Sequence, residues 1–260
     1  MRPAKWNLPP GVSQGTWESF GREDWANEEN QWLAKTPLIQ LDQSFVEEVL
    51  SIPSGRVADL GCGAGRTSLA LARKGFSVLA VDLSAAMLGQ VRAAAKREQL
   101  PIECLEANLV ELGSIASESC ENAVCLFSTL GMIKGSVHRQ KAVGEFFRIL
   151  APGGKLLLHA HQFWWNLRQY GGAAWMTRHL VDSLLLRKTE LGDRYATYRG
   201  VPNFYLHSFR KGELRGLLRG AGFEIELWRP VTGEGASYLR SAYLIPSLRA
   251  GGWLIACRKP

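Results

Sequence analysis

Residues 57–66 read Val57-Ala58-Asp59-Leu60-Gly61-Cys62-Gly63-Ala64-Gly65-Arg66. A short apolar run ends in an acidic residue, and glycines then alternate with other residues until a helical pattern begins at about Arg66. Glycine allows a turn this tight and lets a ligand lie directly on the backbone. The N–H groups that open the following helix would face that ligand. The stretch therefore predicts a strand, a ligand-binding turn and a helix.

The glycine spacing argues against two common phosphate-binding loops. A dinucleotide fingerprint has the spacing G-x-G-x-x-G, whereas this turn reads G-x-G-x-G and places the bulky Arg66 at the sixth position. A Walker loop is absent because no glycine–lysine–serine or glycine–lysine–threonine follows. The turn is therefore expected to hold a ligand other than a pyrophosphate.

Short apolar runs bounded by turn residues recur along the chain. Strands are predicted at residues 56–60, 77–81, 102–106, 123–127 and 155–160, and later at 223–228 and 253–257. Helices are predicted at 42–50, 84–99 and 211–219, and the 84–99 segment has the clearest apolar face. Strands that alternate with helices indicate βαβ units and a parallel sheet buried on both faces.

Polar residues follow the second and third predicted strands. Asp82 stands 17 positions after Gly65 at the tip of the second strand, where a carboxylate can accept hydrogen bonds from a ribose diol. Ser84 is a suitable N-cap for the helix behind it. Asn108 follows the third strand in Leu105-Glu106-Ala107-Asn108-Leu109, either as a ligand contact or as a turn residue.

In order and spacing, these segments resemble the motifs of class I (Rossmann-like) S-adenosylmethionine-dependent methyltransferases over about residues 42–160. The resemblance implies that the glycine turn wraps the methionine part of S-adenosylmethionine, with Asp59 near its ammonium. It also implies that Asp82 holds the ribose, that Leu83 contacts the adenine, and that Asn108 replaces the usual Asp that accepts from the adenine amino group. Residues 124–131 resemble the fourth-strand segment that borders the transferring methyl, and residues 147–158 resemble the helix–turn–fifth-strand signature.

The resemblance implies one α/β domain with a seven-stranded, mostly parallel, doubly wound sheet whose last strand is antiparallel. Residues 1–41 form an N-terminal extension rich in tryptophan, either a lid or plain packing, and residues 42–160 form the cofactor-binding core. An irregular helical cap is expected at 161–209, near the glycine turn, and the last helix and two strands at 210–260. The expected cofactor residues are Asp59, Gly61, Cys62, Gly63, Gly65, Arg66, Asp82, Leu83, Met87, Asn108, Leu109, Phe127 and Ser128.

Histidines near the fifth strand are the candidates for a general base. Transfer from a sulfonium is a direct displacement that needs alignment of the acceptor but no metal. A base helps only where the acceptor is a hydroxyl or a thiol. His159 and His161 share one face at the end of the fifth strand, and His207 precedes the helix at 211–219. For each of the three, a hydrogen-bonded structural histidine is the alternative.

The 161–211 segment is expected to select the acceptor. Its eight basic and three acidic residues supply +5 of the chain's net charge of +7. Aromatic rings are interleaved with them, among them Trp164, Trp165, Tyr170, Trp175, Tyr195, Tyr198, Phe204 and Tyr205. Such mixing suits stacking on RNA bases together with phosphate contacts, or it describes a cap whose aromatics are core and whose arginines are solvated. A small-molecule acceptor is the leading hypothesis. The alternatives are an RNA such as tRNA, and a protein that binds the cofactor without methyl transfer.

The remaining features describe an ordinary globule. No run reaches the ~18 apolar residues of a membrane helix, and no apolar run follows Met1 as in a signal peptide. The five cysteines lack the paired spacing of a zinc site and are expected to be reduced. We therefore expect a cytoplasmic monomer with no membrane partner and no metal.

Overall fold

Seven strands form one sheet in the computed structural model, which describes residues 8–20, 37–169, 171–198, 200–233, 237–239 and 249–260. The sheet order is β3-β2-β1-β4-β5-β9-β8. The strands are β1 (Arg56–Leu60), β2 (Ser77–Asp82), β3 (Ile102–Glu106), β4 (Cys120–Cys125), β5 (Leu150–His161), β8 (Glu224–Val231) and β9 (Gly252–Arg258). β1 to β5 are parallel, and β9 runs antiparallel to both β5 and β8. The predicted seven-stranded sheet with an antiparallel last strand is confirmed.

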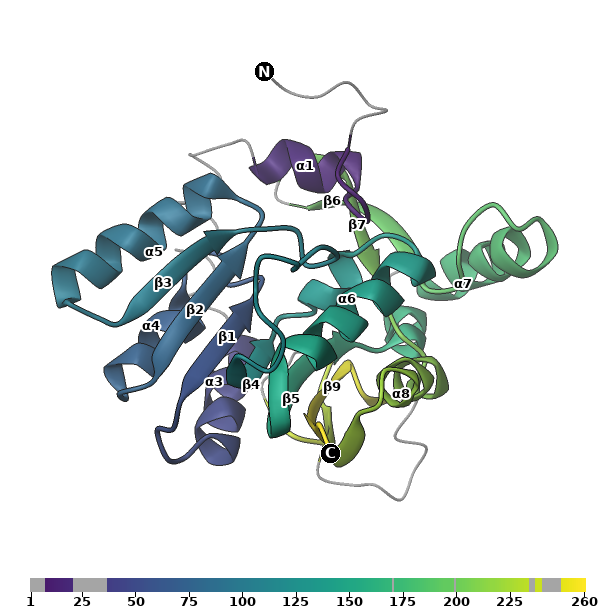
Figure 1. Cartoon of the computed structure of the whole chain (residues 1–260). Helices are drawn as coiled ribbons and strands as arrows, with labels where there is room; N and C mark the ends of the chain where they lie inside the picture. The colour runs from purple at the N-terminus through teal and green to yellow at the C-terminus, as the bar shows by residue number, and fades with distance from the viewer. Residues whose placement is uncertain (1–7, 21–36, 170, 199, 234–236, 240–248) are drawn as a thin grey trace.

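Helices cover both faces of the sheet (Figure 1). On one face lie α3 (Pro37–Val49), α4 (Arg66–Arg73) and α5 (Ala85–Glu98), and on the other lie α6 (Ser136–Ile149) and α8 (Lys211–Gly220). The central strands are buried from both sides, as in β2, where every residue after Ser77 is buried, whereas the edge strand β3 has no fully buried residue. Ser84 caps α5 as expected, since its side chain accepts a hydrogen bond from the Met87 N–H at 3.3 Å.

The insertion after β5 is only partly helical. It begins with η3 (Phe163–Arg168), α7 (Gly172–Leu180) and the π-helical turn η4 (Val181–Leu185). The strands β6 (Asp193–Tyr198) and β7 (Val201–His207) then pair as an antiparallel hairpin. The expectation of a helical cap throughout 161–209 is therefore wrong in its second half. Tyrosine, threonine, valine and phenylalanine dominate the hairpin, and these residues favour extended backbone.

Part of the N-terminal extension lies against this hairpin. The helix α1 (Gln14–Phe20) contacts β7 (Figure 1), and the residues before it cross the carboxyl edge of the sheet. Trp17 is half-buried there, whereas Trp6, Trp25 and Trp32 lie outside the described residues. None of the helices in the described ranges combines the length and the apolar character that crossing a bilayer requires.

Candidate functional site

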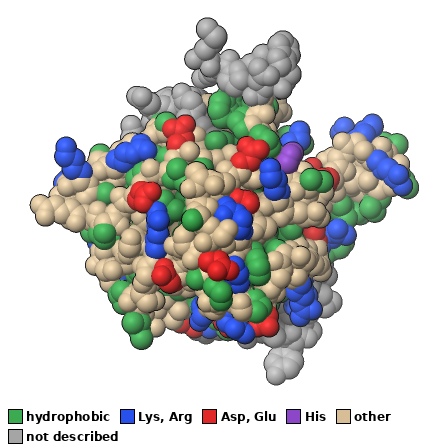
Figure 2. All heavy atoms as spheres, viewed as in Figure 1, with side chains coloured by type: hydrophobic (Ala, Val, Ile, Leu, Met, Phe, Trp, Pro, Cys, Tyr) green, Lys and Arg blue, Asp and Glu red, His purple; other side chains and the backbone are tan. Residues whose placement is uncertain are grey.

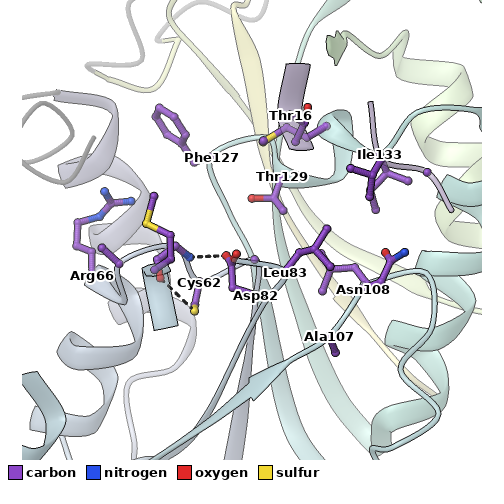
Figure 3. A pocket seen from close by; sticks show the side chains of 18 residues that line it. Thr16, Cys62, Arg66, Asp82, Leu83, Ala107, Asn108, Phe127, Thr129 and Ile133 are labelled. Atoms are coloured by element: carbon purple, nitrogen blue, oxygen red, sulfur yellow. Dashed lines mark hydrogen bonds between the residues drawn. The ribbon is translucent and has the colours of Figure 1, made fainter. Parts of the chain in front are cut away.

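A cavity opens where the glycine turn, the carboxyl ends of β2 and β3, and the segment after β4 meet (Figure 3). Most of the predicted cofactor residues line it: Gly61, Cys62, Gly63, Arg66, Asp82, Leu83, Met87, Asn108, Leu109 and Phe127. Asp82 and Leu83 lie between Asn108 at one end and Arg66 at the other. Asp59, Gly65 and Ser128 do not line it. The predicted residues are thus mostly brought together in one elongated site.

The glycine turn is held to the end of β2 by backbone hydrogen bonds. The N–H groups of Gly61 and Cys62 donate to the Val81 carbonyl at 2.8 and 3.0 Å. Gly61 has φ +80°, and a Cβ atom there would lie 2.3 Å from the Thr129 Cγ2. Glycine is required at this position because both the left-handed backbone and the contact with Thr129 exclude a side chain.

Asp82 ties the same turn to α5 through its carboxylate. Its Oδ2 accepts from the Gly63 N–H and its Oδ1 from the Ser84 N–H, both at 2.8 Å (Figure 3). Burial raises the pKa of this carboxyl, although those backbone donors oppose the shift. Each carboxylate oxygen retains a second lone pair. The side chain can therefore accept from a pair of ligand hydroxyls while it holds the turn.

Asp59 lies beneath the turn rather than in the cavity wall. Its Oδ2 accepts from the Ser68 hydroxyl at 2.6 Å, and burial raises the pKa of its carboxyl to about 6. Gly65, at φ +81°, forms the N-cap of α4. These residues shape the turn from behind, and Arg66 in the first turn of α4 carries the positive charge that faces the cavity.

Asn108 links the third strand to the N-terminal extension. Its Oδ1 accepts from the Val110 N–H at 3.1 Å, and its amide nitrogen donates to the Pro10 carbonyl at 2.9 Å. An aspartate, the usual residue in the resemblance, has no donor for that carbonyl. The departure from the family pattern therefore has a structural reason, and the residue also lines the cavity as expected.

Residues 9–20, called the strap below, close the cavity from above. Gly11, Val12 and Thr16 line it. The Lys134 N–H donates to the Gly11 carbonyl at 2.7 Å and fastens the strap to the segment after β4. The sequence motifs did not assign these residues to the site, nor the other lining residues Ala64, Ala107, Thr129, Met132 and Ile133. The sequence signals for the strap are the Pro9-Pro10-Gly11 turn and the tryptophans of the N-terminal extension, which were compatible with a lid or with plain packing.

The backbone after β4 is strained where it borders the cavity. Phe127 and Ser128 both have positive φ, at 51° and 58°, a conformation that costs energy in residues with a Cβ. The Phe127 N–H donates to Asp42 Oδ2 at 3.3 Å, and the Ser128 hydroxyl accepts from the His161 N–H at 3.1 Å. Phe127 lines the cavity, whereas Ser128 lies behind it and holds the end of β5.

His159 and His161 lie on one face of β5, as predicted. Their rings stack at 5.5 Å with only 6° between the planes. His159 is buried, and its Nδ1 lies 3.0 Å from Asp42 Oδ1. Burial, reinforced by the nearby His159, lowers the pKa of His161 to about 3, and the residue is only partly exposed. His161 is therefore a neutral imidazole at physiological pH. Neither histidine lines the cavity.

His207 is held away from the cavity, inside a buried charge network. Its Nδ1 lies 2.8 Å from Asp193 Oδ1 and its Nε2 lies 2.7 Å from Glu213 Oε1. Burial disfavours the charged ring, but these two carboxylates outweigh it and raise the pKa of His207. Arg139, 2% exposed, joins the network by donating to the Tyr205 hydroxyl at 3.1 Å, which donates to Asp193 at 2.6 Å, and it also pairs with Glu190 at 2.5 Å. Both ring nitrogens of His207 are thus engaged by structural partners.

Comparison with known proteins identifies the fold family. Residues 57–154 match a model described as a methyltransferase domain. The chain is 31% identical to the ubiquinone/menaquinone biosynthesis C-methyltransferase UbiE of Syntrophotalea carbinolica, over 72% of this chain and 76% of the relative. The chain belongs to the S-adenosylmethionine-dependent methyltransferases. The cofactor of this family, S-adenosylmethionine, fits the elongated cavity, with Asp82 at its centre and Arg66 at one end.

Other members of the methyltransferase family match over different lengths. A putative methyltransferase of Geobacillus is 32% identical over 46% of this chain, and the chain spans about half of that relative's length, 49%. The solved SAM-dependent methyltransferase of Methanosarcina mazei is 26% identical, with a TM-score of 0.65 over 82% of this chain and 96% of that one. The family model covers the cofactor-binding core at residues 57–154, and none of these matches identifies the acceptor.

Proposed function

We propose that the protein transfers a methyl group from S-adenosylmethionine to a small organic acceptor that binds beside Phe127 and His161. The main support for this proposal is the strap, which crosses the cavity at Gly11, Val12 and Thr16 and packs against β7. A covered cavity suits a small acceptor better than a polymer. The UbiE relative is named as a C-methyltransferase of ubiquinone and menaquinone biosynthesis, which is in keeping with an acceptor of that size.

Several basic and aromatic groups of the insertion contact one another, which favours this proposal over an RNA acceptor. Within the insertion, Arg168 lies over the Trp165 ring and Arg194 over the Trp175 ring. Phe204 and Tyr205 are buried. RNA recognition by stacking needs aromatic faces that are free for bases. These ring and cation contacts therefore support the packing of the insertion, whereas Arg187 and Lys188 stay exposed on its projecting turn.

Each part of the cavity has a task toward the cofactor. When bound, S-adenosylmethionine supplies a methyl group already activated by its positive sulfur. Asp82 accepts from the ribose hydroxyls, and Arg66 with the first N–H groups of α4 receives the carboxylate. The backbone of the glycine turn would exclude water from the part of the cofactor between the ribose and the carboxylate. Such contacts would hold the cofactor for transfer to an acceptor beside Phe127, and the proximity of that aligned acceptor would contribute most to the rate.

On the acceptor side, we assign to His161 the role of orienting the acceptor. We assign to His159 the role of holding the His161 ring in place. A neutral imidazole with a pKa of about 3 donates or accepts a hydrogen bond but removes few protons. Asp42 holds His159, and His159 stacks behind His161 and fixes its ring. His207 stabilises the insertion. Transfer to an acceptor that is already nucleophilic agrees with such a site.

A transfer assay tests the proposal. The protein is incubated with methyl-labelled S-adenosylmethionine and, in separate reactions, with phenols and quinols, amines, thiols, or total bacterial RNA. Labelled small product together with S-adenosylhomocysteine is expected. Label in RNA would establish the RNA alternative instead. Tight cofactor binding without S-adenosylhomocysteine in any reaction would indicate a protein that binds the cofactor without methyl transfer.

Paired variants separate the two halves of the site. Asp82→Ala should weaken S-adenosylhomocysteine binding roughly 5- to 150-fold in calorimetry, because two hydrogen bonds to the ribose are lost. His161→Ala should leave that affinity nearly unchanged but reduce turnover roughly 10- to 100-fold through misplacement of the acceptor. Glu106→Ala is the control, since this exposed carboxylate pairs in register with Asp82 at the end of β3 but lies outside the cavity. The reverse pattern for His161→Ala, lost affinity with normal turnover at saturation, would place this residue on the cofactor instead.

A further inference from the structure

The lobe formed by α7 and η4 exposes large aliphatic side chains to solvent. It projects from the body of the molecule (Figure 1). Val181, Leu184, Leu185 and Leu186 are 40%, 59%, 75% and 51% exposed. Isolated exposed leucines are ordinary, but such a dense group on a projecting turn is typical of an interaction surface.

These aliphatics do not hold the lobe in place. The lobe is anchored by its opposite side, where Met176 and His179 are buried. His179 stacks on Trp175 at 4.6 Å, and its Nε2 accepts from the Gly192 N–H at 2.9 Å. Backbone hydrogen bonds close the turn itself, as from the Leu186 N–H to the Val181 carbonyl at 3.0 Å. The exposed leucines are therefore available to a partner.

Basic residues adjoin the leucines directly. Arg187 and Lys188 follow Leu186, are exposed, and have no ion-pair partner within the part of the chain that the structure describes. Arg178 precedes Asp182 by one helical turn. Its side chain is 86% exposed and lies 3.7 Å from that carboxylate. Hydrophobic and basic side chains adjoin on this projection in Figure 2. A partner surface must therefore be apolar inside and negatively charged at its rim.

We propose that residues 178–188 dock onto the surface of an anionic lipid bilayer. The leucines enter the boundary between headgroups and acyl chains, while Arg178, Arg187 and Lys188 lie among anionic headgroups. A second copy of the chain fits less well, because a two-fold contact here would bring like charges of both copies together. The absence of an exposed tryptophan or phenylalanine within residues 178–188 argues against RNA. Such docking differs from the expectation that the protein has no membrane partner, which was based on the lack of a spanning segment.

Vesicle flotation with the full chain tests this docking surface. Vesicles of phosphatidylglycerol and phosphatidylcholine should carry the protein, and vesicles of phosphatidylcholine alone should carry much less. The Leu184→Ser/Leu185→Ser/Leu186→Ser variant and the Arg187→Glu/Lys188→Glu variant should each reduce the bound fraction at least about tenfold. Raised salt should weaken binding by the wild type, since it screens the headgroup attraction.

The control is Ile52→Ser, which removes another highly exposed aliphatic side chain, 77% exposed, from the segment that precedes β1. It should float as the wild type does. The docking surface is overturned if the wild type ignores anionic vesicles, if Ile52→Ser lowers binding as much as the leucine variant, or if the leucine variant only converts a dimer into a monomer. The charge variant keeps the test decisive where the leucine variant folds poorly. The assay needs neither cofactor nor acceptor, so its outcome is independent of the proposed methyl transfer.

Discussion

Asp59 is a buried carboxylate whose ionisation opposes folding. Burial raises the pKa of this carboxyl to about 6, whereas an unfolded chain has about 3.9. Between these two pH values the folded state binds more protons than the unfolded state. The free energy of unfolding therefore falls as the pH rises from about 3.9 to about 6. The hydrogen bond from the Ser68 hydroxyl favours the charged form and offsets part of this cost.

Asp59→Asn should therefore stabilise the ligand-free protein. Asparagine can still accept from the Ser68 hydroxyl but carries no charge. The gain in the free energy of unfolding should reach up to roughly 3 kcal/mol at pH 7 and shrink below pH 6. Urea unfolding at pH 4.5, 6 and 7.5 measures this difference. A variant that is less stable than the wild type at pH 7.5 would contradict the role of burial.

For single residues, the sequence motifs predicted most of the cavity lining but not the direction of every side chain. The glycine turn, Asp82 and Asn108 were predicted to share one site, and they line one cavity. Asp59 was predicted beside them and lies underneath. A motif tells which residue ends a strand, but the local backbone decides whether its side chain points above or below the turn. The second role of Asn108, to hold the strap at Pro10, depends on a segment 98 positions away.

At the scale of elements, the strap depends on a close contact between α1 and β7. Gly15 lies in α1, and a Cβ atom there would be 2.4 Å from the Asn203 carbonyl oxygen. Because that neighbour is backbone, Gly15→Ala must push α1 away from the hairpin. S-adenosylhomocysteine should then dissociate roughly tenfold faster, since overpacking of this kind costs at least about 1 kcal/mol and the strap lines the cavity.

Gly89→Ala in α5 is the matched control for this helix contact. No atom lies within 4 Å of a Cβ at that position, and alanine favours a helix more than glycine does. Stopped-flow dissociation should therefore be unchanged in this control. Equal dissociation rates for Gly15→Ala and the wild type would show that the strap does not retain the ligand.

Elements differ in how much of their structure the local sequence carries. The strands β1, β2 and β3 begin and end within one residue of the prediction, because buried parallel strands are apolar runs between turn signals. β4 begins three residues earlier than predicted. The hairpin β6–β7 and the strap lack such runs. Contacts with each other and with the segment after β4 stabilise them, and no local pattern reveals those contacts.

At the scale of the whole molecule, a buried charge network joins the insertion to the core. Arg139 from α6, Asp193 and His207 from the hairpin, and Glu213 from α8 meet there. Burial opposes ionisation of both carboxyls, yet the hydrogen bonds from His207 hold the pKa of Asp193 and that of Glu213 below the usual range. Net charge counted along the sequence could not reveal this network, because its members come from three separate segments.

The sign of each shift defines where the network stabilises the fold. The carboxylates contribute above their unfolded pKa of about 4 and lose that contribution as the pH falls through their lowered folded values. His207 has a raised pKa, so its contribution is complete below about 6.5 and disappears as the pH rises through the folded value. Stability from the network should therefore be largest between about pH 4.5 and 6.5.

His207→Gln distinguishes a structural role from a catalytic one. Glutamine cannot supply a positive charge to both Asp193 and Glu213, so the free energy of unfolding should fall by about 3 kcal/mol or more at pH 6. The loss should shrink at higher pH, where the wild-type ring is also neutral. Turnover per folded molecule and cofactor affinity should stay near wild-type values. His138→Gln, at a half-buried histidine of α6 that lies outside this network, should change neither property. If His207→Gln instead abolished turnover while urea unfolding stayed unchanged, His207 would belong to the catalytic site, and the insertion would have to open for the reaction.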